Sequence, residues 1–229
     1  MAPVCYFASA MFRFLRDLAE NNNRPWFQKN KHRYENDVKD PALQFIADCA
    51  PYLEKISPHF RADPRPVGGS LFRIYRDIRF SKDKSPFKTS VGIHFRHLYA
   101  KDVHAPGFYL HLEPREIFAG VGIWHPDSKT LKKIRDAIVD HPAAWKKAIT
   151  SKSFRSCYGL VGDSLARAPG GYDPEHPLVE DLKRKDFIGL AHLSRKTVTG
   201  SGFMSEFAAL CRAGAPLQRF LCAAVDVPY

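Results

Sequence analysis

The sequence predicts a soluble α+β fold in which helices pack on one face of an antiparallel sheet. Apolar residues recur every three to four positions in the first and last parts of the chain, and at every second position in the middle part. Helices and strands therefore come in runs and do not alternate as in a parallel βαβ sheet. We expect the 229 residues to form a single domain, residues 1–229.

The first third of the chain is predicted to be helical. Ser9 can cap the first helix, because a serine hydroxyl can accept a hydrogen bond from a free backbone N–H of the first turn. Pro51 should kink or divide the third helix, since proline removes a hydrogen-bond donor. The Pro- and Gly-rich run 63–69 ends the helical part. The three helices are expected to begin at Ser9, Pro25 and Pro41.

The middle third is predicted to form antiparallel strands. Apolar Val91, Ile93 and Phe95 alternate with Gly, His and Arg, which is typical of a strand with one buried face. Most of the connections are too short for a helical crossover, so neighbouring strands should pair antiparallel. The expected strands are Ser70–Arg76, Val91–His97, Phe108–Glu113 and Ile117–Ile123.

The last part returns to helices around one further strand. Pro126 and Asp127 can open a helix, and a short hairpin is expected near Phe154–Leu165. A loop is expected at 169–177 and a strand at Phe187–Leu193. The other expected helices are Pro142–Ile149, a segment with Leu178 and Leu182, and an amphipathic segment from Phe203 to Leu221.

The charge balance indicates an affinity for anions. Lys and Arg total 35 and Asp and Glu total 24, which gives +11 with neutral histidines. Such a field attracts phosphates, nucleic acid or acidic partners. The five cysteines have no C-x-x-C spacing and indicate reduced thiols. The apolar start Ala2–Phe12 is too short to cross a bilayer, so we expect a cytoplasmic protein with no membrane partner.

The densest functional signal is the basic segment 73–88. It holds six cations and two carboxylates, and so it contributes +4 of the net charge of +11. Guanidinium and ammonium groups suit the oxygens of phosphate and carboxylate. The candidate ligand-binding residues are Arg73, Tyr75, Arg76, Arg79, Lys82, Lys84 and Lys88.

Several readings of the basic segment stay open. The leading one is a pocket for an anionic, phosphate-bearing small molecule. The alternative is a nucleic-acid-associated module, because Tyr75, Phe80 and Phe87 stand between the cations and could stack on bases. A third is a non-catalytic structural or adaptor protein in which a buried Arg73 belongs to an internal salt-bridge lattice. The plainest is a solvated basic loop whose carboxylates only hold its shape.

Motifs along nearly the whole chain carry a family resemblance. They are Asn21-Asn22 through Pro25-Trp26-Phe27, Phe72 through Asp77, Arg79 through Pro86, Lys88-Thr89, Tyr109-Leu110-His111, Gly122 with Trp124 and Pro126, Leu131 with Arg135 and Ile138, and Pro169 with Gly171-Tyr172. Through them the chain resembles the bacterial and fungal family catalogued as domain of unknown function 2461, over residues 8 to 225. The resemblance implies no activity. The chain departs from the family pattern at Phe87, where Tyr is usual, at Ser90, where His is frequent, and at Gly170, where a basic residue is frequent.

His111 and Glu113 are the first candidates for acid/base catalysis. They lie two residues apart on an expected strand and therefore share one face. Asp77 and Asp83 are further candidates, but carboxylates among cations should have a lowered pKa, which favours a role in orienting the cations. The chain has no H-E-x-x-H or Cys/His ligand spacing. We therefore expect no metal and no cofactor, and whether the protein is an enzyme stays open.

Overall fold

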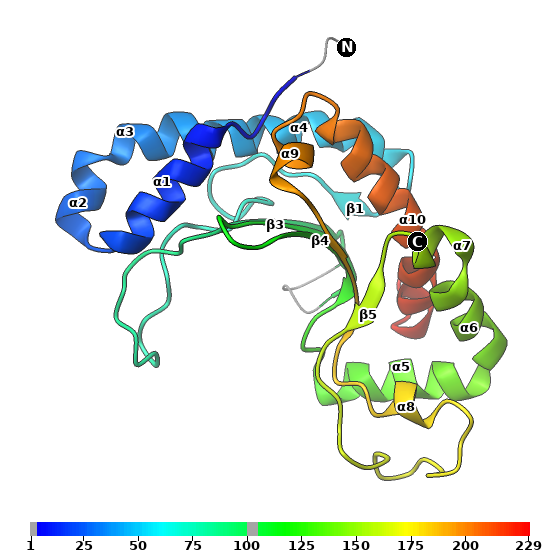
Figure 1. Ribbon diagram of the computed structural model, residues 1–229. Helices are drawn as coiled ribbons and strands as arrows, with labels where there is room; N and C mark the ends of the chain where they lie inside the picture. The colour runs from blue at the N-terminus through cyan, green and yellow to red at the C-terminus, as the bar shows by residue number, and fades with distance from the viewer. Residues whose placement is uncertain (1–3, 100–104) are drawn as a thin grey trace.

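The computed structural model describes residues 4–99 and 105–229, and in this part of the chain six strands form one antiparallel sheet (Figure 1). Their order is β1-β2-β3-β4-β6-β5. Residues 2 and 3 of the apolar start lie outside the described residues. The strands are β1 (Phe60–Arg61), β2 (Val91–His97), β3 (Gly107–Leu112), β4 (Ile117–Ile123), β5 (Gly159–Val161) and β6 (Phe187–His192).

Helices precede, interrupt and follow the sheet, which confirms the α+β prediction. The N-terminal group is α1 (Ser9–Glu20), α2 (Arg24–Lys29), α3 (Lys31–Tyr34), a π-helical turn η1 (Glu35–Lys39) and α4 (Asp40–Glu54). The middle and C-terminal helices are α5 (Ser128–Asp140), α6 (Pro142–Thr150), α7 (Lys152–Arg155), α8 (Val179–Leu182), α9 (Arg195–Val198) and α10 (Phe203–Ala224). No helix within the described ranges is long and apolar enough to cross a membrane.

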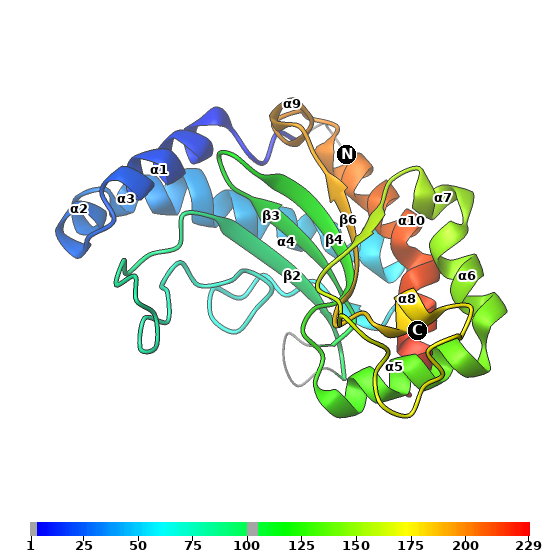
Figure 2. The same ribbon diagram turned by 60° about the horizontal axis from the view of Figure 1, so that its bottom comes forward.

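One face of the sheet carries the hydrophobic core. Figure 2 shows β2, β3, β4 and β6 side by side, with α10 beyond them. On β2 the alternate residues of this face are fully buried, and the Phe95 ring lies 5.7 Å from that of Phe207 on α10. Gly214 of α10 approaches β4 so closely that an added Cβ would lie 2.8 Å from the Val121 side chain. This face is therefore closed by helix packing.

The opposite face of the sheet is polar. The register pairs His94 of β2 with Tyr109 of β3, and His111 of β3 with Phe118 of β4, so these side chains point to the same side. The Phe72 ring lies 6.1 Å from that of His94 and 5.9 Å from that of Tyr109. The segment that leads into the basic region thus covers part of the polar face.

The helix predictions are confirmed apart from details of their ends. The first helix begins at Ser9, but Ala8 occupies the N-cap position and no side chain caps the helix. Of the two effects predicted for Pro51, a kink or a division of the third helix, the division is wrong, because α4 continues to Glu54. Pro51 lies in the last turn of α4, so its missing N–H removes one helical hydrogen bond and only three helical residues follow it.

Two strand predictions are wrong. The segment Ser70–Arg76 forms no strand and has only isolated bridges, from Leu71 to the sheet edge and from Tyr75 to Phe87 in its own returning chain. It leaves the sheet after Phe72, whose amide donates to the Gly92 carbonyl. The hairpin expected near Phe154–Leu165 is instead α7 followed by β5, which pairs with the distant β6.

Candidate functional site

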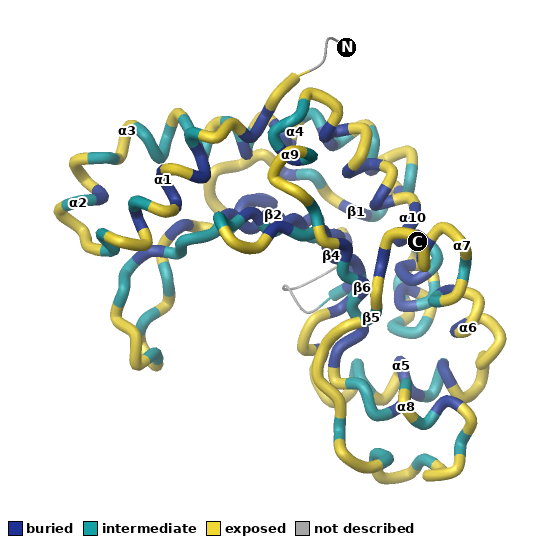
Figure 3. The backbone as a smooth tube through the Cα atoms, in the orientation of Figure 1, coloured by how far each residue is buried: buried dark blue, intermediate teal, exposed yellow. Residues whose placement is uncertain are grey.

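The basic segment 73–88 projects from the body of the protein as a long loop (Figures 1 and 3). Its two arms are joined near the base. The Arg76 amide donates to the Pro86 carbonyl over 2.9 Å, and the Lys88 amide donates to the Ile74 carbonyl over 2.7 Å. The loop therefore has a paired stem, and most of the residues beyond it are exposed.

The stem of the loop is fixed to the N-terminal helices. Phe87 is 2% exposed and its ring stacks on Phe27 at 4.1 Å. The Asn22 side chain donates to the Phe87 carbonyl over 2.9 Å and accepts from the Phe87 amide over 3.0 Å. Phe87 therefore has no free ring face to offer to a nucleic acid base.

The two aspartates of the loop hold its arginines. Asp77 accepts from Arg79 Nε over 2.9 Å and from a terminal nitrogen over 2.6 Å, and these bonds lower the pKa of Asp77 to about 2. Asp83 accepts from Ser85 and forms an ion pair with Arg76, which holds the pKa of Asp83 well below its usual range. Carboxylates this acidic are poor bases near neutral pH, so the geometry fits an orienting role.

The tip of the loop is exposed and basic. The Lys84 ammonium donates to the Ile78 carbonyl over 3.0 Å. The Lys82 side chain has no hydrogen bond or ion pair with any residue in the described ranges. Phe80 is 94% exposed, and the Arg79 guanidinium lies 5.8 Å from its ring. The tip thus presents one bare aromatic ring among cations.

Arg73 and Lys88 form a separate pair of cations where the loop meets the sheet. The half-buried Lys88 ammonium lies 5.3 Å from the Phe72 ring. Burial lowers the pKa of Lys88, and the nearby charge of Arg73 lowers it further. Within the part of the chain that the structure describes, neither side chain has a hydrogen bond or an ion pair. The structural or adaptor hypothesis requires a buried Arg73 in an internal salt-bridge lattice. Arg73 is exposed and does not meet this requirement.

The acid/base candidates lie in a row on the polar face. His111 Nδ1 is 3.2 Å from the Tyr109 hydroxyl, and His111 Nε2 is 3.4 Å from Glu113 Oε2. The Thr89 hydroxyl donates to Glu113 Oε1 over 3.2 Å. The Phe118 ring stacks on the imidazole at 4.8 Å with an interplanar angle of 10°. The shared face predicted for His111 and Glu113 is confirmed, and both side chains are held in place.

Glu116 is a neighbour of this row that sequence reasoning missed. The Glu113 amide donates to the Glu116 carbonyl over 2.9 Å and so closes the turn between β3 and β4. The turn places a Glu116 carboxylate oxygen within 4.8 Å of ligand atoms of His111 and Glu113, and these three residues form a group that could hold a metal ion. The signal in the sequence was the pair of glutamates three residues apart across an expected tight turn.

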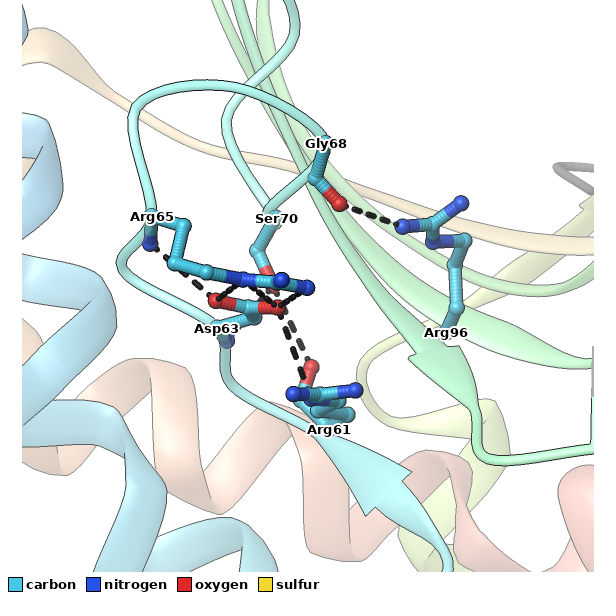
Figure 4. Close-up of polar contacts among 6 residues, drawn as sticks. All are labelled: Arg61, Asp63, Arg65, Gly68, Ser70 and Arg96. Carbon is cyan, nitrogen blue, oxygen red and sulfur yellow. Dashed lines mark hydrogen bonds and ion pairs between the residues drawn. The ribbon is translucent and has the colours of Figure 1, made fainter.

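A second basic cluster lies at the other end of β2 and was also missed (Figure 4). The buried Asp63 carboxylate accepts from Arg65 over 2.6 Å and lies 3.4 Å from Arg61 Nε. Arg96, the register partner of Arg61, donates to the Gly68 carbonyl over 3.1 Å. Arg61 and Arg65 thus share the Asp63 carboxylate, whereas Arg96 binds a backbone carbonyl. A hollow of about 100 Å³ beside them is lined by Arg61, Asp63, Ser70, Arg96, His97 and Leu98.

The structure divides the sequence-predicted residues among three places. Arg73 and Lys88 lie near the sheet, and His111 and Glu113 lie on its polar face. The remaining candidates, Tyr75, Arg76, Arg79, Lys82 and Lys84, belong to the projecting loop with Asp77 and Asp83. Tyr75 is 56% exposed, and its ring lies 5.4 Å from that of Phe87.

Comparison with protein families gives a match over most of the chain. A family model described as "Conserved hypothetical protein (DUF2461)" matches residues 10–220. Searches of curated proteins and of solved structures returned no match. The match covers the helices and strands from α1 into α10, including the basic loop and the polar face.

Proposed function

The chain belongs to this family of conserved hypothetical proteins, DUF2461, and from that premise we propose that it binds an anionic, phosphate-bearing small molecule at the polar face of its sheet. The observation that supports this proposal is the pair formed by Arg73 and Lys88. The charge of Arg73 acts on Lys88, and neither side chain forms an ion pair with a carboxylate among the described residues. Asp77, which interacts with Arg73 without forming an ion pair, is already bonded to Arg79. A bound anion would supply the missing charge.

The chemistry of the pair suits phosphate. Arginine offers a planar fork of donors, and lysine offers three rotatable ones. Lys88 is half-buried, so its hydrogen bonds to an anion face less competition from water than those of an exposed lysine. The arginines beyond the stem differ, because Arg76 and Arg79 already have carboxylate partners. Arg73 and Lys88 are therefore the primary contacts in this proposal.

The acid/base row lies next to the proposed anion site. Thr89 follows Lys88 in the chain, and its hydroxyl is bonded to Glu113. An anion held by Lys88 would therefore be near the polar row that contains His111. This neighbourhood suggests that the bound molecule is a substrate, and turnover of a bound compound is the observation that would establish an enzyme.

Binding of inorganic phosphate and pyrophosphate, measured by titration calorimetry, tests the proposal. A hydrogen bond to a charged group contributes about 1.5–3 kcal/mol, so Arg73→Gln and Lys88→Gln should each weaken binding about tenfold or more. Lys82→Gln is the matched control, because Lys82 is an exposed cation of the same loop without a partner among the described residues. Native mass spectrometry of the purified protein should also detect a co-purified anion.

Two outcomes would contradict the assignment. Affinity that is unchanged in both Arg73→Gln and Lys88→Gln would remove these residues from the site. Affinity that is lost in Arg96→Gln alone would move the anion to the hollow beside Arg61 and Asp63.

Nucleic acid binding is the second candidate, and the exposure of Phe80 favours it. A bare aromatic ring beside Arg79 at the tip of a basic loop is an arrangement on which single-stranded bases stack. Fluorescence anisotropy with a single-stranded oligonucleotide should then show a log–log salt slope of about −0.7 per neutralised phosphate. Phe80→Ala should weaken the binding. Absence of binding at about 50 mM salt would eliminate this candidate.

A further inference from the structure

Three potential metal ligands meet at the end of β3. The ligand atoms of His111, Glu113 and Glu116 lie within 4.8 Å of one another. The 3.4 Å between His111 Nε2 and Glu113 Oε2 is long for a hydrogen bond. It equals the separation of about 3.4 Å expected for two ligands of one tetrahedral zinc ion, given metal–ligand distances of about 2.1 Å.

The surroundings of these ligands hold them in a geometry suited to a metal. His111 Nδ1 is engaged by the Tyr109 hydroxyl, which leaves Nε2 to face the carboxylates. The Thr89 hydroxyl holds one oxygen of Glu113 and leaves the other directed at the imidazole. Metal-binding histidines usually have such a hydrogen bond at their second ring nitrogen. The stacked Phe118 ring further restricts the imidazole.

The charges of the cluster also favour a cation. Two glutamates and a neutral imidazole carry −2 together, which one divalent ion would balance. The side chain of Glu113 is 34% exposed, and Glu116 is exposed, so an ion could enter from solvent.

We propose that His111, Glu113 and Glu116 bind one divalent transition-metal ion, with zinc or manganese as the expected class. An imidazole ligand favours these metals over magnesium and calcium, which prefer sites made wholly of oxygen atoms. Three protein ligands leave a coordination position open, as in catalytic zinc sites. The site shares no residue with the Arg73 and Lys88 pair, so metal binding does not depend on anion binding.

Calorimetric titration of the metal-depleted, untagged full-length protein with Zn²⁺ alone, and separately with Mn²⁺, tests the proposal. One ion should bind per chain. Glu116→Gln should reduce the affinity at least tenfold, and it should leave the fold intact because Glu116 is exposed. His111→Gln should reduce the affinity further. Tyr109→Phe should reduce it about 10- to 100-fold, as expected when the hydrogen bond that orients a metal-binding histidine is removed.

His192→Gln is the matched control, because His192 is an exposed histidine of the same sheet that lies outside the cluster. Its affinity should equal that of the wild type, and thermal melting should show that every variant is folded. Absence of binding at about 100 μM free metal would overturn the proposal. So would binding that is equally strong in the wild type, Glu116→Gln and His111→Gln, because the ion would then bind elsewhere, for instance at the exposed Cys5 or Cys157.

Discussion

Substitution of His94 should make the fold less sensitive to acid. His94 is 7% exposed, and its Nδ1 has no hydrogen-bond partner among the described residues. Burial, with a further effect of Arg96, lowers the pKa of His94 from 6.5 to about 4. The other polar or aromatic groups near the imidazole are Phe72 and Tyr109, and neither is an anion that could stabilise a proton on it.

The sign and size of the effect follow from this shift. The unfolded state binds the proton more readily than the folded state, so stability is full above pH 6.5 and falls as the pH drops towards 4. With these two pKa values, the free energy of unfolding should fall by about 2 kcal/mol between pH 7 and pH 5 through His94 alone. For a chain of this size that corresponds to about 4–8 °C in the melting temperature.

Urea unfolding followed by circular dichroism at pH 7, 6 and 5 measures the effect. His94→Gln cannot titrate, so its loss of stability over this range should be about 2 kcal/mol smaller than that of the wild type. The variant will also lose packing, but that loss is the same at each pH and cancels in the comparison. His192→Gln replaces an exposed histidine of the same sheet and serves as the control for removing an imidazole. Equal pH dependence in His94→Gln and the wild type would refute the reasoning.

Two further predictions concern stability and use paired variants. Gly122→Ala should lower the free energy of unfolding by about 2 kcal/mol or more, because the φ of Gly122 is +126° and an added Cβ would overlap the Phe187 carbonyl oxygen. Gly159→Ala should be nearly neutral, because the space around Gly159 is open. Equal urea midpoints in the two variants would contradict this prediction. Phe87→Ala should cost about 3–5 kcal/mol and Phe80→Ala less than about 0.5 kcal/mol, since one ring is buried and the other exposed. A similar loss in both, measured by the same unfolding assay, would show that the loop stem is not part of the core.

The strands that could be predicted from the sequence are those in which apolar and polar residues alternate because one face of the strand is buried. Residues 91–97 and 117–123 were predicted with their observed bounds, because each alternates between a helix-covered face and a polar face. Residues 70–76 alternate in the same way but do not form a strand. Their partners are set by the path of the returning chain, since Tyr75 pairs with Phe87 and not with the sheet. An alternating apolar and polar pattern indicates which residues can form a strand. It does not indicate whether another strand lies beside them to pair with.

The site was predictable to the same extent. His111 and Glu113 share a face because residues two apart on a strand always do. The approach of Glu116 depends on a turn, and that of Arg73 to Lys88 depends on the two arms of a loop meeting at its stem. The Asp63 cluster depends on the distant pairing of Arg61 with Arg96. Contacts of these kinds arise from tertiary structure, and no spacing rule in a single sequence encodes them.

The Asn22 side chain and the Phe87 backbone are joined by two hydrogen bonds, which fix the stem of the loop to a residue 65 positions earlier in the chain. Because the stem is held there, the tip can be lengthened without moving the sheet. Doubling the length of a flexible loop costs only about 0.6 kcal/mol. The tip between Ile78 and Lys84 is therefore a natural point for a genetically inserted epitope or fluorescent reporter, placed beside the proposed anion site and outside the hydrophobic core.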